Sequence, residues 1–336
     1  MTKTAVLGGG SWGTALAREL ALKNIDTVLY IRNEEQKCKL AKTQINSRYL
    51  PGITLPENLS YSSDLDDSID GANFIVLAVP TNSVREMLSS LKGKIDEDVI
   101  LINVAKGIEM DTLMRVSEIS NELLPNNSFV ALSGPTHAEE VALDYPSTIV
   151  AASKDLDAAL KVQNLFMSDT FRVYTNDDLL GVELAGALKN VIALANGILV
   201  GLGYGDNTMA ALMTRGVAEI TRLGTTMGAL PSTFLGLAGV GDLIVTCTSP
   251  HSRNRKCGQL IGEGKSVEEA IEEVGMVVEG IKTTSAAKKL SERYDVDMPI
   301  TNALYEVLYE GADVKDSAYS LMVRSKKHEM ERSLRG

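Results

Sequence analysis

The chain has 336 residues, which is longer than one typical domain and predicts two. Its 44% hydrophobic and 23% charged residues are typical of a globular protein and exclude a disordered, collagenous or disulfide-framework chain. With 44 acidic against 33 basic residues, the net charge of −11 argues against nucleic acid or an anionic membrane surface as the main partner. An anionic substrate therefore needs a local basic site.

The cysteines and histidines indicate whether the chain binds a metal or forms disulfides, and the N-terminus indicates its compartment. The three cysteines are an odd number without CxxC spacing, and the three histidines are scattered, so neither a disulfide framework nor a metal site is expected. Residues 1–3 run directly into the strand-like 4–7 and leave no room for a signal peptide. The most apolar stretch, 179–202, is interrupted by polar residues and is interpreted as a buried helix. We expect a cytoplasmic protein without integral membrane contact.

The first half of the chain alternates short apolar runs with amphipathic stretches, which is typical of a parallel sheet wound by helices. The run 74–79 is apolar at every position, as expected for a strand covered on both faces. Residues 12–20, 81–91 and 155–166 have helical spacing. The expected strands are 4–7, 27–31, 74–79, 99–105, 129–133, 147–152 and 171–174.

From about residue 178 onward the β-branched runs disappear and the pattern becomes helical. The expected helices are 178–200, 208–227, 266–273, 280–292 and 300–310. We therefore expect an α/β fold: a Rossmann-like, doubly wound, mostly parallel sheet over 1–178 as the dinucleotide-binding domain, then an all-helical substrate-binding domain over 179–336. The boundary is expected to be a direct passage from strand to helix.

The first candidate site is the run Gly8-Gly9-Gly10-Ser11-Trp12-Gly13, which follows a strand and opens a helix. This is the context of the dinucleotide fingerprint. Gly8 permits the tight turn, Gly10 lets the backbone approach the pyrophosphate, and Gly13 lets helix and strand pack closely. Free amides at the helix N-terminus then meet the phosphate charge. A glycine-rich turn without a ligand is the alternative.

The choice of cofactor is indicated at the end of the second strand. Many NAD sites place an acidic residue there to hold the ribose hydroxyls. Here strand 27–31 is followed by Arg32-Asn33. An arginine suits a 2′-phosphate and offers an NAD ribose no acceptor. The sequence favours NADP(H), with NAD(H) as the alternative cofactor and a solvated arginine as the simpler explanation.

Two further candidates follow strands in this half. Lys106 follows strand 99–105 and is expected at the carboxyl edge of the sheet, where open α/β folds bind ligands. In segment 133–138, Gly134 allows backbone approach and Thr136 offers a hydroxyl. A solvated lysine and a Gly-Pro turn are the simpler explanations.

The helical half contains a lysine in an otherwise apolar helix. Lys189 either reaches solvent or is kept for function. If it is buried, desolvation lowers its pKa and brings it within range of acid–base chemistry near neutral pH. Asn196, seven residues on, shares its face.

Two candidates follow. Asp242 comes after three residues that include two glycines, where capping of a helix is the simpler explanation. The segment 246–256 crowds hydroxyls, an amide and three cations, which in an acidic protein suggests phosphate binding. A solvated charged loop is the alternative.

Together these segments resemble the bacterial NAD(P)-dependent glycerol-3-phosphate dehydrogenases over essentially the whole chain. The motifs that carry the resemblance are 8–17, 105–109, 133–135, 182–190, 214–216, 241–243, 252–255 and 278–280.

The resemblance implies an enzyme that reversibly reduces dihydroxyacetone phosphate to sn-glycerol 3-phosphate with NAD(P)H, for phospholipid biosynthesis. It implies that Lys189 is the acid–base residue, giving a proton to the carbonyl oxygen and removing it in the reverse direction. Lys106 is implied to lie between nicotinamide and substrate and polarise that oxygen. Asp242 is implied to orient the lysine or a substrate hydroxyl.

The same resemblance, with the glycines of the turn, assigns binding positions. The substrate positions are Lys106, Gly134, Thr136, Lys189, Asp242, Ser252, Arg253 and Asn254. The cofactor positions are Gly8, Gly10, Ser11, Trp12, Gly13, Arg32, Asn33, Tyr49, Lys106, Ala138, Arg253, Val277 and Glu279. Thr136 stands where many members carry serine, and the Arg32-Asn33 pair is less basic than the pairs often found there.

Two other functions fit parts of the pattern. A β-hydroxyacid or 6-phosphogluconate type dehydrogenase also joins a dinucleotide domain to a helical one and uses a lysine. Lys106 and the segment 252–255 favour a small phosphorylated ketone instead. A non-catalytic dinucleotide sensor would not need Lys106, Lys189 and Asp242 together. The apolar helical domain makes a homodimer the expected assembly.

Overall fold

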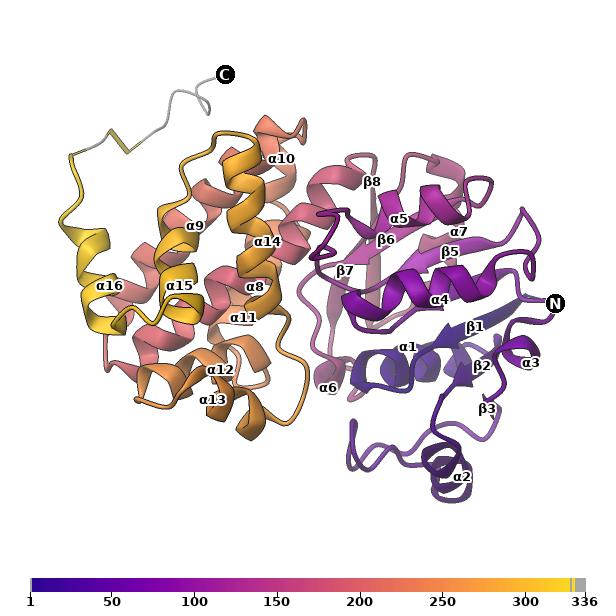
Figure 1. Ribbon diagram of the computed structural model, residues 1–336. Helices are drawn as coiled ribbons and strands as arrows, with labels where there is room; N and C mark the ends of the chain where they lie inside the picture. Colours follow the sequence, from indigo (N-terminus) through magenta and orange to yellow (C-terminus); the bar gives the residue numbers. More distant parts are fainter. Residues whose placement is uncertain (1, 327, 330–336) are drawn as a thin grey trace. The chain divides into compact units, whose positions relative to one another are not determined.

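The computed structural model describes residues 2–326, 328 and 329, and eight strands of this part form one sheet in the order β3-β2-β1-β4-β5-β6-β7-β8 (Figure 1). The strands are β1 (Lys3–Leu7), β2 (Asp26–Tyr30), β3 (Leu59–Ser62), β4 (Phe74–Leu77), β5 (Ile100–Asn103), β6 (Phe129–Ser133), β7 (Ser147–Ala152) and β8 (Phe171–Asn176). Neighbouring strands run parallel except for β6 and β7, which are antiparallel. The expected Rossmann-like, mostly parallel sheet is confirmed.

The sheet is covered by helices, which explains why β4 and β5 are buried at every position. The helices of this half are α1 (Ser11–Leu22), α2 (Glu34–Thr43), α3 (Leu65–Ile69), α4 (Val84–Leu91), α5 (Val116–Leu123), α6 (Ala138–Val141) and α7 (Leu156–Phe166). Helix α1 contacts α6 and α7, and α4 contacts α5 (Figure 1). The sheet is therefore doubly wound, as expected.

Several strand predictions were wrong in detail, and the strand expected over 74–79 ends at Leu77. The short strand β3 was missed, because its sequence Leu-Ser-Tyr-Ser has no apolar run. The strand expected over 99–105 ends at Asn103, whose side chain accepts a hydrogen bond from the Ala105 amide and donates one to the Ala105 carbonyl. These local bonds turn the chain out of the sheet.

The chain divides into two compact units, residues 1–105 with 116–179 and residues 106–115 with 180–336. The sequence placed 106–115 in the first domain, whereas Ile108 and Leu113 belong to the apolar core of the helical unit. Strand β8 ends at Asn176 and the next helix begins at Leu179, so the passage is direct. Residues 1, 327 and 330–336 of the expected domains lie outside the described residues.

The second unit is helical (Figure 1). Its helices are α8 (Leu179–Gly201), α9 (Asp206–Thr226), α10 (Pro231–Phe234), α11 (Asp242–Thr248), α12 (Arg253–Gly262), α13 (Val267–Val274), α14 (Glu279–Arg293), α15 (Pro299–Tyr309) and α16 (Val314–Met322), with a π-helical turn at Leu237–Gly241. The sequence predicted α8, α9, α13, α14 and α15. It missed α10, α11, α12 and α16, and the polar junction between α11 and α12 resembles a loop.

Helix α8 packs against α12 with backbone in contact with backbone. A Cβ atom on Gly197 of α8 would lie 2.1 Å from the carbonyl oxygen of Arg255, and one on Gly258 of α12 would lie 2.0 Å from that of Leu194. Only glycine allows this approach. The crossing fixes the start of α12 against the helix that carries Lys189.

Two helical stretches, Leu179–Gly201 and Pro231–Thr248, are long and apolar enough by length and composition to cross a membrane. In the first, 83% of the apolar window is buried inside the protein. In the second, 44% is buried, and the stretch comprises α10, the π-helical turn and α11. Helix α8 is thus a core helix of its unit, as the sequence predicted.

Candidate active site

The glycine-rich turn joins β1 to α1 where the order of the sheet reverses, between β1 and β4. Ligands of open parallel sheets bind at this point. Gly8 has a φ of +132°, and a Cβ atom there would lie 2.4 Å from the carbonyl oxygen of Ala78, just after β4. A Cβ atom on Gly13 would lie 2.0 Å from the Gly8 carbonyl oxygen. Packing within the protein therefore requires both glycines.

Gly10 is different, because a Cβ atom there would meet nothing within 4 Å. Gly10 is the N-cap of α1 and, lacking a side chain, offers no acceptor to the first helical amides. Open space beside unsatisfied amides at a helix N-terminus is what a pyrophosphate needs. The turn thus fits a dinucleotide.

Side chains from the segment after β2 brace this turn. The Gly9 carbonyl accepts hydrogen bonds from Asn46 Nδ2 at 3.0 Å and from Gln36 Nε2 at 3.2 Å. Ser11 Oγ donates to the Tyr49 carbonyl at 2.6 Å. The structure therefore brings Ser11 and Tyr49 together. Asn46 was missed by the sequence reasoning, because nothing in its neighbourhood marks it.

Three other predicted cofactor positions lie nearby in the chain. The indole of Trp12 packs against Phe171, with ring centroids 6.4 Å apart, and belongs to the rim of the core. Asn33 accepts a hydrogen bond from the Gln36 amide and caps α2. Arg32 is exposed, and its guanidinium has no hydrogen-bond or ion-pair partner within the described part of the chain.

The predicted positions after β6 are held by local contacts. A Cβ atom on Gly134 would lie 3.0 Å from the Ile149 Cα atom, so glycine lets β6 approach β7. Thr136 Oγ1 donates to the Gly134 carbonyl at 3.3 Å. Ala138 is buried as the first residue of α6. The turn itself accounts for these contacts.

Three predicted residues meet inside the helical unit. Lys106 Nζ lies 2.6 Å from Asp242 Oδ2, and Lys189 Nζ lies 2.8 Å from Asp242 Oδ1. The Asp242 side chain is 2% exposed and that of Lys189 is 8% exposed. Asp242 is the first residue of α11 but makes no capping hydrogen bond, so the simpler explanation as a helix cap was wrong. Its carboxylate bridges two lysines instead.

Burial tunes the two groups of this cluster in different ways. It lowers the pKa of Lys189 to about 8, which Asp242 partly offsets and Lys106 reinforces. Burial by itself would raise the pKa of Asp242, but the two lysines outweigh it and lower that pKa. The predicted fall in the Lys189 pKa is confirmed. Lys189 can therefore give or accept a proton near neutral pH.

Thr246 completes the cluster. Its Oγ1 accepts a hydrogen bond from Lys189 Nζ at 2.5 Å and donates one to the Asp242 carbonyl at 2.6 Å. The sequence reasoning placed Thr246 only in the run suspected of binding phosphate. Its position four residues after Asp242, on the same face of a helix, could have linked the two.

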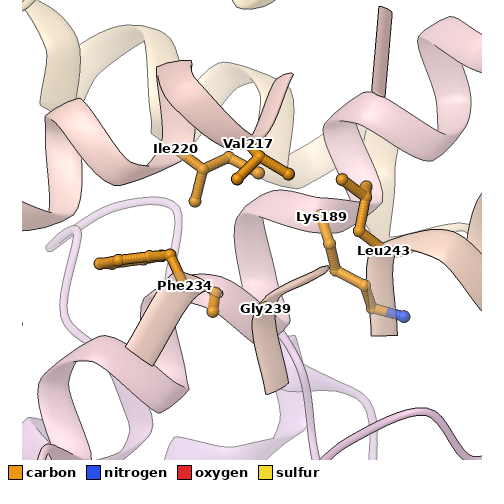
Figure 2. A pocket seen from close by; sticks show the side chains of 7 residues that line it. Lys189, Val217, Ile220, Phe234, Gly239 and Leu243 are labelled. Carbon is orange, nitrogen blue, oxygen red and sulfur yellow. The ribbon is translucent and has the colours of Figure 1, made fainter. Parts of the chain in front are cut away.

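The stem of Lys189 lines a small apolar pocket (Figure 2). Its walls come from α8, α9, α10, the π-helical turn and α11, through Ala185, Val217, Ile220, Phe234, Gly239 and Leu243. Figure 2 shows the nitrogen of Lys189 pointing away from Phe234. The apolar walls shield the stem from water, and burial of Lys189 as a whole is the main cause of its lowered pKa.

The segment that carries Lys106 is anchored in the same unit. Asn190 Nδ2 donates to the Lys106 carbonyl at 3.1 Å, and Arg115 pairs with Glu183 of α8 at 2.5 Å. Lys106 follows the carboxyl end of β5, as expected, but lies three residues beyond it because the strand ends at Asn103. The anchoring explains how a residue from the first half joins the helical unit.

The segment 252–255 is the start of a helix rather than a loop. Ser252 Oγ accepts a hydrogen bond from the Arg255 amide and caps α12. Arg253 is exposed, and its guanidinium has no ion-pair or hydrogen-bond partner among the described residues. A helix N-terminus beside a free guanidinium is suited to an anion.

Asn254 ties this helix to the rest of the cluster. It is buried, donates to Asn190 Oδ1 at 2.9 Å and accepts from the Gly280 amide at 2.9 Å. Two predicted cofactor positions come just before Gly280 in the chain. Val277 is 43% exposed, whereas Glu279 is half-buried as the first residue of α14. Asn190 was missed as a site residue, although it follows Lys189.

A Rossmann-type sheet with a dinucleotide turn and a helical unit with a buried lysine pair define the class of two-domain nicotinamide dehydrogenases. The family models for the N-terminus and the C-terminus of NAD-dependent glycerol-3-phosphate dehydrogenase match residues 3–159 and 178–319. The chain belongs to this family, which settles the choice against the β-hydroxyacid and 6-phosphogluconate types.

The similarity to known relatives extends over nearly all of this chain. The glycerol-3-phosphate dehydrogenase (NAD(P)+) of Clostridium perfringens is 53% identical and is covered to 99%, with 98% of this chain covered. That of Bacillus pumilus is 52% identical, with 98% of this chain and 97% of the relative covered. The crystal structure of glycerol-3-phosphate dehydrogenase from Coxiella burnetii is 35% identical, with a TM-score of 0.93 over 96% of this chain and 99% of that one.

Proposed function

We propose that this protein is an NAD(P)-dependent glycerol-3-phosphate dehydrogenase that reversibly reduces dihydroxyacetone phosphate to sn-glycerol 3-phosphate, for the synthesis of glycerophospholipids. The observation that carries the proposal is the buried Lys106–Asp242–Lys189 cluster in a chain of this family. Two lysines can meet the charge of a ketone oxygen without a metal ion.

Lys189 is the proposed acid–base residue. The reduced nicotinamide, when bound, supplies a hydride to C2 of the ketone. Negative charge then develops on the C2 oxygen, and Lys189 Nζ donates a proton to it. In the reverse direction Lys189 accepts the proton of the C2 hydroxyl. Thr246 and Asp242 hold Nζ in one orientation by accepting from it.

Lys106 and Asp242 support this transfer. Lys106 supplies a fixed positive charge to polarise the carbonyl oxygen. Asp242 holds both ammonium groups through its two oxygens, so their mutual repulsion does not drive them apart. Because all three side chains are largely shielded from water, their charges act strongly on a substrate oxygen.

The substrate phosphate is proposed to bind at the start of α12. Arg253 offers a free guanidinium, and the first amides of the helix offer partial positive charge. Ser252 and Asn254 shape this end through the cap and the buried bond to Gly280. Holding the phosphate fixes the reacting carbon and lowers the entropic cost of reaction. We also assign Gly134 and Thr136 to substrate contacts.

The first unit is proposed as the dinucleotide-binding domain and the helical unit as the substrate-binding domain. NADP(H) is favoured because Arg32 has a free guanidinium at the end of β2, and NAD(H) also fits, as the names of the relatives indicate. The proposed cofactor contacts are Gly8, Gly10, Ser11, Trp12, Gly13, Arg32, Asn33, Tyr49, Lys106, Ala138, Arg253, Val277 and Glu279.

We further infer that the enzyme acts in the cytoplasm as a homodimer. The three cysteines of the chain are unpaired, which suits a reducing compartment. Exposed apolar side chains of the helical unit, such as Leu235 at 71% and Met322 at 80%, offer surface for self-association. Light scattering of the purified protein would give a dimer mass, and a monomer would contradict this inference.

The test is oxidation of NADPH and NADH, followed side by side with dihydroxyacetone phosphate. Both cofactors should be oxidised, NADPH more efficiently. Dihydroxyacetone without its phosphate is the matched control and should react far more slowly, because it lacks the group that binds α12. Failure to oxidise either cofactor with the phosphorylated ketone would remove the proposed function and revive the non-catalytic dinucleotide sensor.

A further inference from the structure

Residues of opposite charge, Arg32 and Glu34, lie close in the chain where β2 ends and α2 begins. Arg32 is exposed and unpaired within the described residues, whereas Glu34 and Glu35 form the first turn of α2. The Cα atoms of Arg32 and Glu34 can be at most about 7 Å apart along the chain. Flexible side chains on Cα atoms this close can bring their charges within the Debye length of about 8 Å at physiological ionic strength. Glu34 is therefore placed to neutralise Arg32 or to repel a phosphate bound there.

The structure shows Glu34 engaged elsewhere. Its carboxylate lies 2.8 Å from Lys37 Nζ, accepts a hydrogen bond from Ser63 Oγ just after β3, and accepts one from Cys38 Sγ at 3.2 Å. The bonds from Lys37, Ser63 and Cys38 lower the pKa of Glu34 to about 2. The carboxylate is thus ionised at every physiological pH, and its charge is offset by Lys37 rather than by Arg32.

Glu35 provides the internal comparison. It carries the same charge, one residue further along the first turn of α2, and is exposed. Within the described residues it has no hydrogen-bond or ion-pair partner. Successive helical residues point about 100° apart, so Glu34 and Glu35 face different surroundings. Of the two, only Glu34 is tied to the end of the neighbouring strand β3.

We propose that Lys37 and Ser63 hold Glu34 away from Arg32 and thereby set the choice between the 2′-phosphate of NADP(H) and the 2′-hydroxyl of NAD(H). With Glu34 held, the Arg32 guanidinium stays free for a phosphate. With Glu34 released, its carboxylate neutralises Arg32, repels a phosphate and accepts a hydrogen bond from a ribose hydroxyl. The proposal rests on the proposed function only in that the cofactor binds at the turn Gly8–Gly13.

The test measures binding of NADPH and NADH to the full-length protein without substrate. Trp12 is the chain's one tryptophan and lies in the glycine-rich turn, so quenching of its fluorescence reports occupancy of the site. The variants are Lys37→Gln, Lys37→Gln with Glu34→Gln, and Glu35→Gln as the matched control. All three sites lie on the surface of α2, where such changes leave the core intact.

Lys37→Gln should lower the ratio of NADPH to NADH affinity by about three- to fivefold, the size of an exposed charge interaction. The added Glu34→Gln change should restore that ratio, because the released carboxylate is gone. Glu35→Gln should leave the ratio close to that of the parent. A further variant, Ser63→Ala, should lower the ratio less than Lys37→Gln does, because Lys37 still offsets the charge of Glu34.

An unchanged ratio in Lys37→Gln would overturn the proposal. So would a fall that Glu34→Gln does not reverse, since that result would mean that Lys37 contacts the phosphate directly. A parent protein that binds both cofactors but oxidises neither with dihydroxyacetone phosphate would defeat the proposed function and leave this inference standing. A parent protein that binds neither cofactor would defeat both.

Discussion

The glycine-rich turn and the lysine cluster are built in opposite ways. In the turn, the glycines that the backbone requires all lie within six positions of one another, although Ala78 and Asn46 from other segments pack against them. In the cluster, side chains from 106, 189 and 242 converge on one carboxylate. A local site can be identified from its spacing, whereas a convergent site cannot. Substitutions in each region should therefore separate cofactor binding at the turn from turnover at the cluster.

The largest effect is expected from Lys189→Met, which removes the amine and keeps an apolar stem in the pocket. Turnover should fall by about a thousandfold, within the range of general acid–base catalysis. Cofactor affinity should be unchanged, because the glycine-rich turn at Gly8–Gly13 belongs to the first unit and Lys189 is not among its contacts. Steady-state kinetics and cofactor titration on the same sample separate the effect on turnover from the effect on cofactor affinity. Near-normal turnover would remove Lys189 from its role.

Asp242→Asn should have the next largest effect, reducing turnover by about 10- to 100-fold through loss of orientation and charge. Asp242 raises the pKa of Lys189, so its removal should lower that pKa further below about 8. The pH profile of the reduction should therefore shift to lower pH. A drop in turnover without any shift would show that Asp242 acts on substrate rather than on Lys189.

Two alanine substitutions should distinguish the glycine that borders the cofactor space from the glycine that packing requires. Gly10→Ala should weaken cofactor binding by about tenfold, because its methyl enters the space proposed for the pyrophosphate, and leave thermal stability nearly unchanged. Gly13→Ala should lower stability by about 1–3 kcal/mol, the usual cost of overpacking. Thermal melting with cofactor titration distinguishes them. Loss of stability in Gly10→Ala would contradict the open space seen there.

The smallest effect is the pH dependence of the parent enzyme. Lys189 must be protonated for reduction, so the rate should fall as pH rises through about 8. Oxidation needs the neutral amine and should rise over the same interval. Between pH 8 and 9 reduction falls only about fivefold, and oxidation rises by a smaller factor. The rates of reduction and oxidation, measured across pH 6.5–9.5 with saturating cofactor, should change in opposite directions as the pH rises. If both rates changed in the same direction, a single acid–base group would be excluded.

Much of the fold could be predicted because its signals are local. The all-apolar strand Phe74–Leu77 is marked by composition, and the long apolar helix Leu179–Gly201 by length. The strand Leu59–Ser62 and the helix Arg253–Gly262 could not be predicted, because their residues are mostly polar and take their form from neighbours. The helix Arg253–Gly262 is held in place by packing of Gly258 against the Leu194 carbonyl, a contact that the sequence does not reveal.

By itself, the sequence determined a doubly wound sheet and a glycine-rich turn at Gly8–Gly13, and it predicted a dinucleotide site and a set of functional lysines, because glycine spacing and apolar periodicity act over short stretches. Only the tertiary structure decided that residues 106–115 belong with the helical unit and that Thr246 completes the Lys189 contacts. It also decided that Glu34 is bound by Lys37 and Ser63 rather than by Arg32. The physical reason is that charge pairing depends on distance in space, which sequence separation does not measure.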